Sequence, residues 1–195
     1  PAPEPAPAPG PAPAPSPSPL PGEAVSLYLE AEAGTIVSAF QAGSDPLASG
    51  GAYLATSAKT KEAANGATEV RVPVTIPSDG SYYLWARILG PADDQDAVYV
   101  GLDGSFDRMF PKQLNAYEWV KGKKAQQLAA GAHEITLGHG EPQLRVDVLL
   151  VTNDPSHGER AMETLDGDLD RRVLRCAGDV LARDGRQLAR ALEGA

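Results

Sequence analysis

The sequence has few of the residues that cross-link or catalyse. It contains one cysteine, Cys176, which excludes an internal disulfide. The three histidines, His133, His139 and His157, do not follow the HExxH spacing of metal ligands, and neither a nucleophile elbow nor a phosphate-binding glycine loop occurs. We therefore expect a protein that is not an enzyme.

Positive charge is also scarce. The chain has 17 Lys and Arg against 26 Asp and Glu, and the acidic excess lies in residues 23–154, with 10 basic and 17 acidic side chains. Without a basic stripe, nucleic-acid binding through phosphates is not expected. No apolar run approaches the roughly 20 residues of a membrane-spanning helix. Neither a nucleic acid nor a membrane is thus an expected partner.

Proline is common only at the beginning of the chain. Residues 1–22 hold eleven of the 18 prolines, one at every odd position. Proline fixes φ and removes the amide donor, so this segment is predicted to be an extended polyproline-II linker, about 65 Å long. The chain also lacks a start methionine and a signal-peptide pattern, which suggests a processed or excised product. Such spacers are typical of extracellular, secreted or cell-surface proteins.

Residues 23–154 show the two-residue period of β-strands. "EVRVPVTI" places its apolar side chains at 70, 72, 74 and 76 on one face, and "SYYLWARIL" and "DAVYVGLDG" alternate in the same way. Gly-rich and Asp-Gly turns separate these runs, and no helical pattern lies between them. This region is predicted to be an all-β domain, an antiparallel β-sandwich.

Residues 155–195 have a helical period instead. This C-terminal segment is predicted to form an amphipathic helix, whose apolar stripe needs a partner: the sandwich, a second copy or another protein chain. The stripe consists of Met162, Leu165, Leu169, Val173, Cys176 and Val180.

Three acidic residues stand in or beside the apolar strand patterns. In "LYLEAEAG", strand alternation would place Glu30 and Glu32 on the same face, about 7 Å apart. In the last strand, Asp147 would share a face with Leu149 and Val151, where an unpaired carboxylate is costly to bury. A metal ion, a basic side chain or solvent would have to offset these charges.

Two arrangements follow from this pattern. If the first and last strands are neighbours, Glu30, Glu32 and Asp147 converge and offer the hard oxygen ligands that Ca²⁺ prefers. Alternatively, the glutamates lie on a solvated face and Asp147 pairs with Arg145 or Arg87. Spacing alone does not decide between them.

The ordered landmarks "YLEAEAG", "ASGGAYL", "VTIPSDGSYYLWARI", "DAVYVGLDG", "YEWVKG" and "LAAGAHEITLGHGEPQLRVDVLLVTND" resemble those of carbohydrate-binding module families six and thirty-five. The resemblance covers about Val25 to Asp154. It implies a galactose-binding-like jelly-roll sandwich of a kind often attached to secreted polysaccharide-active enzymes. It also implies a structural calcium ion at Glu30, Glu32 and Asp147.

The resemblance is weaker at the sugar site. Ala116 replaces the family's platform tryptophan, and Arg145 replaces its ligand asparagine. The remaining candidate ligand contacts are Tyr53, Asn115, Tyr117 and Arg145. The tyrosines could instead be core or rim residues, and Arg145 could form a surface ion pair. An arginine in the cleft would suit an acidic sugar, whose carboxylate it can pair.

The sequence thus predicts a non-catalytic, calcium-stabilised module that binds polysaccharide or another glycan at its loop ends. The alternative is a structural or adhesive sandwich that has lost the sugar site and assembles through its C-terminal helix.

Overall fold

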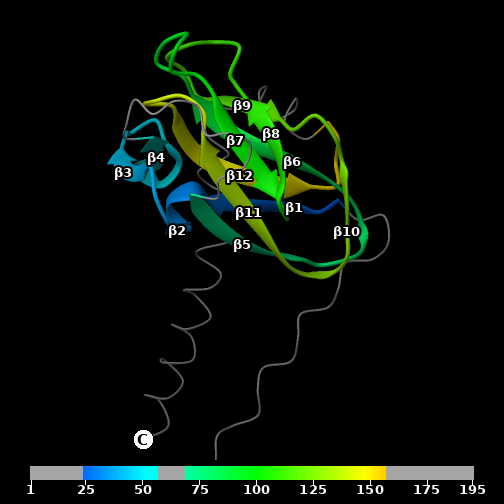
Figure 1. Ribbon diagram of the computed structural model, residues 1–195. Helices are drawn as coiled ribbons and strands as arrows, with labels where there is room; N and C mark the ends of the chain where they lie inside the picture. The colour runs from blue at the N-terminus through cyan, green and yellow to red at the C-terminus, as the bar shows by residue number, and fades with distance from the viewer. Residues whose placement is uncertain (1–23, 57–68, 157–195) are drawn as a thin grey trace, which may run out of the picture.

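The computed structural model describes residues 24–56 and 69–156, which form two β-sheets packed face to face (Figure 1). All pairings between the strands are antiparallel, which confirms the predicted β-sandwich. The predicted linker at 1–22 and the helix predicted from Met162 onward lie outside the described residues. Within those residues, no helix is long and apolar enough to cross a membrane.

The elements are, in chain order, β1 (Ser26–Glu30), η1 (Ala31–Ala33), β2 (Thr35–Ile36), β3 (Phe40–Ser44), η2 (Ser49–Gly51), β4 (Ala52–Thr56), β5 (Val70–Ile76), β6 (Gly80–Leu89), β7 (Val98–Leu102), β8 (Ser105–Met109), β9 (Glu118–Lys121), β10 (Gln126–Leu128), β11 (Gly131–His139) and β12 (Arg145–Thr152).

The larger sheet has seven strands and the smaller has five. The larger is ordered β10-β6-β12-β4-β3, with β1 also paired to β12 and β9 to β6; the smaller is ordered β2-β5-β11-β7-β8. The first and last strands are therefore neighbours, with Glu30 opposite Val148. The arrangement brings the end of β1 close to the beginning of β12.

The main core lies between the sheets and follows the predicted alternation. Along β5, buried and exposed residues alternate strictly. The even-numbered β6 residues Tyr82, Leu84, Ala86 and Ile88 all join this core. Each fully buried aliphatic side chain stabilises the fold by about 1.5–3 kcal/mol. The predicted Asp-Gly turn also forms, with positive φ at both residues between β7 and β8.

A second apolar cluster covers the other face of the larger sheet. It consists of Trp85, Trp119, Val148 and Leu150, all buried. The Tyr28 and Trp119 rings meet edge to face with their centroids 6.1 Å apart. Strands β6 and β12 thus bury side chains on both faces of the larger sheet. This packing holds the strand ends, and the loops attached to them, in fixed positions.

The prediction that Glu30 and Glu32 share a face by strand alternation was wrong. Strand β1 ends at Glu30, and Glu32 lies in the 3₁₀ turn η1. The turn is required because the chain passes here from the larger sheet to β2 of the smaller one. The two carboxylates are near each other because of this turn.

The predicted position of Asp147 on the face of Leu149 and Val151 was also wrong. A β-bulge interrupts β12, where Val146 pairs with Ile88 but Val148 pairs with Arg87. Val146 and Leu149, three residues apart, both join the main core. The extra residue at a bulge re-aims a side chain, and here the Asp147 carboxylate meets Arg87.

Candidate ligand-binding site

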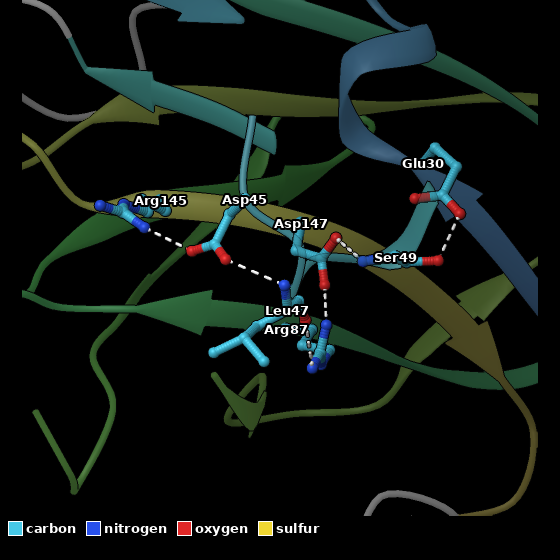
Figure 2. A network of polar contacts seen from close by, with 7 residues as sticks. All are labelled: Glu30, Asp45, Leu47, Ser49, Arg87, Arg145 and Asp147. Atoms are coloured by element: carbon cyan, nitrogen blue, oxygen red, sulfur yellow. Dashed lines mark hydrogen bonds and ion pairs between the residues drawn. The ribbon is translucent and has the colours of Figure 1, made fainter. Parts of the chain in front are cut away.

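A network of charged and polar side chains lies where the beginning of β12, the end of β1 and the β3–β4 loop meet (Figure 2). We call it the loop-end network. Its members are Glu30, Asp45, Ser49, Arg87, Arg145 and Asp147.

Asp147 lies at the centre of this network and is fully buried. Its Oδ2 pairs with Arg87 Nη1, and its Oδ1 accepts a hydrogen bond of 2.9 Å from the Ser49 amide. Burial raises the pKa of Asp147 to about 7 and the Glu30 charge adds to this, although Arg87 and the Ser49 amide oppose it. Asp147 therefore has a basic partner, Arg87, as the alternative to metal binding predicted.

Ser49 links Asp147 to the end of β1. Its hydroxyl donates a 2.7 Å hydrogen bond to Glu30 Oε1 while its amide binds Asp147. Gly50 and Gly51 follow with φ of 61° and 77°, a left-handed backbone that glycine adopts at low cost. These glycines let the loop turn sharply enough for Ser49 to reach both carboxylates.

Glu32 has the environment expected of a cation ligand. Its Oε2 is buried and accepts no hydrogen bond. Burial raises the pKa of Glu32, and the neighbouring Glu30 charge raises it further. A cation would offset both costs, so the donor chemistry of Glu30 and Glu32 fits Ca²⁺.

Asp147 fits a metal less directly than the glutamates, because both of its carboxylate oxygens already accept hydrogen bonds. Within residues 24–56 and 69–156, no three His, Cys, Asp or Glu side chains are arranged to hold a metal ion. Metal binding through Glu30, Glu32 and Asp147 thus stays a prediction.

Arg145 and Tyr53 form one side of the network. Arg145 Nη1 lies 2.6 Å from Asp45 Oδ2, so the ion pair considered for Arg145 is present. The guanidinium carbon lies 4.7 Å from the centroid of the Tyr53 ring, in cation–π geometry. The opposing residue on β3 is Gly43, where an added Cβ would come within 2.4 Å of the Tyr53 ring. Glycine leaves the space that the tyrosine ring occupies.

Tyr117 forms a second arginine–tyrosine stack with Arg87. The guanidinium carbon lies 4.6 Å from the ring centroid. Burial, followed by the charges of Asp147 and Asp45, raises the pKa of Tyr117 to about 12. The hydroxyl is buried and has no hydrogen-bond partner among the described residues. Arg145, which lies close enough to interact with this hydroxyl, partly opposes the rise in its pKa.

Three of the four predicted ligand contacts thus belong to one neighbourhood, and the fourth stands apart. Asn115 is exposed in the β8–β9 loop, with a positive φ of 61°. Its amide donates a 2.8 Å hydrogen bond to the Gly90 carbonyl. No contact in the described structure joins its side chain to Tyr53, Tyr117 or Arg145.

Sequence reasoning missed Asp45 and Ser49. Asp45 precedes a proline, and its Oδ1 accepts a 2.9 Å hydrogen bond from the Leu47 amide two residues later. Asp-Pro is a known turn-initiating signal, so this local role was detectable. The ion pair with Arg145 was not, because 100 positions separate the two residues.

A second pair of acidic residues, Asp96 and Glu141, lies in the loops that precede β7 and β12. The Asp96 amide donates a 2.9 Å hydrogen bond to Glu141 Oε2, and Arg108 binds the other Glu141 oxygen at 3.0 Å. Burial, then interaction with Glu141, raises the pKa of Asp96 to about 6. The protonated form of Asp96 is therefore favoured by folding.

This shift predicts a pH-dependent effect on stability. A raised carboxyl pKa contributes stability that is complete below about pH 4 and is lost as pH rises through about 6. Asp96→Asn stays neutral at every pH. The difference in melting temperature between this variant and the wild type is therefore expected to be a few degrees more in the variant's favour at pH 8 than at pH 4.5. Asp94→Asn, at an exposed position in the same loop, is the control and should show no such gain. Equal pH profiles for the two variants would refute the effect.

No protein-family model and no curated protein matches the sequence. Solved structures do match. A family 35 carbohydrate-binding module from Clostridium thermocellum aligns with a TM-score of 0.50 at 19% identity, over 64% of this chain and 97% of the module. The C-terminal family 6 module of a marine laminarinase from Zobellia galactanivorans aligns at 0.50 and 17%, over 66% of this chain and all of that one.

The chain has the fold of carbohydrate-binding modules of families 6 and 35. The family 35-bearing GH26 β-(1,4)-mannanase of Podospora anserina also aligns, with a TM-score of 0.53 at 14% identity. That match covers 67% of this chain but only 28% of the mannanase. The likeness to such a large enzyme is thus confined to one part of it.

At the position that the sequence resemblance assigns to a platform tryptophan, this chain has no ring. Ala116 is exposed there, in the β8–β9 loop. Trp119, three residues later on β9, is only 3% exposed and belongs to the cluster on the outer face of the larger sheet. Neither residue offers an aromatic surface at the loop ends, so Tyr53 and Tyr117 are the aromatic candidates there.

Proposed function

We propose that this module binds a glycan at the loop end of the sandwich, through Tyr53, Tyr117 and Arg145. The observation that supports this most strongly is that Arg145 belongs to the loop-end network and that both tyrosines stack on its arginines, in a chain with the fold of carbohydrate-binding modules. Ring faces and fixed polar donors are the two elements of sugar recognition. Asn115, on the adjacent loop, is proposed to contact a longer ligand.

Arg145 is the proposed polar anchor. Its side chain is 32% exposed, and Asp45 occupies Nη1. A partly exposed guanidinium can donate to sugar hydroxyls or, with more energy, to a carboxylate. An acidic polysaccharide is therefore the preferred candidate ligand.

The test is affinity electrophoresis of the full chain in gels that contain β-1,4-mannan, laminarin or polygalacturonate. The first two follow from the mannanase and the laminarinase among the structural neighbours. Retention in at least one gel is expected, and Arg145→Ala should weaken it about tenfold, the effect of roughly 1.4 kcal/mol. Arg71→Ala, on the smaller sheet, removes the same charge and should be retarded by the polysaccharide as strongly as the wild type, each measured against its own mobility in a gel without polysaccharide. No retention in any gel would contradict the proposal.

We further propose that Glu30 and Glu32, with Asp147 beside them, hold a calcium ion. Calcium would neutralise the buried carboxylates and fix the end of β1 against the β3–β4 loop, so its role is structural. The proposal extends to an exported or cell-surface protein, in which millimolar calcium would be available.

One observation favours the structural alternative. Both candidate tyrosines have an arginine over one ring face, and Ala116 replaces the expected platform. A sandwich that had lost its sugar site would be retained by no polysaccharide and would assemble through residues 155–195. Light scattering of the chain with and without that segment tests the assembly, and two monomeric samples would refute it.

A further inference from the structure

Leu47 is an exposed apolar side chain at the loop-end network. It lies in the β3–β4 loop and is 71% exposed, more than any other large hydrophobic residue in the described ranges. A single exposed leucine needs no explanation in general. This one has an unusual setting, because its backbone is held on both sides.

The two backbone groups of Leu47 bind the two halves of the network (Figure 2). Its amide donates to Asp45 Oδ1 at 2.9 Å, and Asp45 is paired with Arg145. Its carbonyl accepts a 3.2 Å hydrogen bond from Arg87 Nη2, and Arg87 is paired with the buried Asp147. Two ion pairs thus fix the loop with the leucine side chain turned to solvent.

Leu47 is also linked through its backbone to both arginine–tyrosine stacks, directly to Arg87 and through Asp45 to Arg145. Arg145 covers one face of Tyr53, and Arg87 covers one face of Tyr117. Those faces cannot stack on a sugar ring. A sugar ring that meets these arginines needs an apolar contact from another residue. Leu47, whose backbone is hydrogen-bonded to Asp45 and Arg87, is an exposed apolar residue of this network.

We propose that Leu47 is a ligand contact that receives the apolar C–H face of a pyranose ring, while oxygens of the same sugar accept hydrogen bonds from Arg145. The inference rests on the proposed glycan-binding function and adds a residue to that site. The Leu47 amide and the Arg145 guanidinium bind the two oxygens of one carboxylate, that of Asp45, which places the two residues next to each other in the network.

The fixed backbone explains why a leucine can serve in place of an aromatic platform. A loop already in its bound conformation loses little freedom when the ligand arrives. The side chain itself has few rotatable bonds to restrict. Because Leu47 is exposed in the free protein, replacing it should alter ligand affinity and leave folding stability unchanged.

The experiment compares Leu47→Ala and Leu47→Asp with the wild-type full chain. The probe is whichever of β-1,4-mannan, laminarin and polygalacturonate retains the wild type best. Leu47→Ala is expected to weaken binding about tenfold, as removal of most of a buried leucine contact does, and Leu47→Asp to weaken it further. Val37→Ala is the control, because Val37 is 58% exposed but follows β2 on the smaller sheet.

The outcomes separate the two proposals. Weaker binding by both Leu47 variants, with unchanged melting temperatures and a neutral Val37→Ala, supports the assignment. Wild-type affinity in Leu47→Ala overturns the assignment but leaves glycan binding intact. If the wild type binds none of the three polysaccharides, the proposed function fails and the assignment fails with it.

Discussion

Replacing Arg87 with alanine is expected to lower the free energy of unfolding by about 3–5 kcal/mol, because it leaves the buried Asp147 carboxylate without its cation. Arg87 is 13% exposed in its side chain and Asp147 is fully buried, so solvent cannot replace the lost partner. The variant also loses the stack on Tyr117 and the hydrogen bond to the Leu47 carbonyl. The measurement is urea unfolding at pH 8, where the wild-type Asp147 is ionised.

The matched control is Arg71→Ala. Arg71 pairs with Glu134 at 2.6 Å, but the two side chains are 51% and 40% exposed. Exposed ion pairs contribute less than about 1 kcal/mol. A second variant, Arg87→Ala combined with Asp147→Asn, removes the buried charge and should recover part of the loss. If Arg87→Ala lowers the free energy of unfolding no more than Arg71→Ala does, the buried Asp147 carboxylate does not need Arg87 as its counter-charge, and the prediction is wrong.

Calcium removal is expected to have the second largest effect. A ligand at 100 times its dissociation constant stabilises the folded state by about 2.7 kcal/mol. For a domain of this size, that amounts to roughly 10 °C in melting temperature. The melting temperature at neutral pH should therefore fall when EGTA replaces millimolar calcium. An unchanged melting curve would contradict the calcium proposal.

Glu32→Gln gives this experiment a distinctive signature. Burial raises the pKa of Glu32, so its ionised form costs stability in the absence of a cation. The neutral variant should melt higher than the wild type in EGTA and gain nothing from calcium. Asp147→Ala should also lose the calcium response. Glu134→Gln, at an exposed position paired with Arg71, should keep the full response.

The sequence predicted the parts of the fold that depend on local pattern. Alternation along β5 and β6 identified the main core, and the Asp-Gly pair identified the β7–β8 turn. The calcium prediction required the first and last strands to be neighbours, and in the structure β1 and β12 pair with each other. Residues 1–22 and the predicted helix beyond residue 156 remain predictions.

The bulge at Asp147 had no signal in the sequence. A strand with one extra residue reads the same as a regular strand, and only its pairing with β6 reveals the shift. The bridge from Ser49 to Asp147 was equally hidden, because 98 positions separate them. The site depends on such long-range pairs, whereas alternation and turn signals report on neighbours in the chain.

The most direct test of the account is to map the glycan-binding surface by NMR, with the full chain and the polysaccharide that retains it best. The account predicts that the largest chemical-shift changes fall on residues 45–53, on Tyr117 and on Arg145. Changes centred instead on Tyr28, Tyr83 and Trp85, on the outer face of the larger sheet, would contradict it. So would the absence of any change at ligand concentrations that saturate retention.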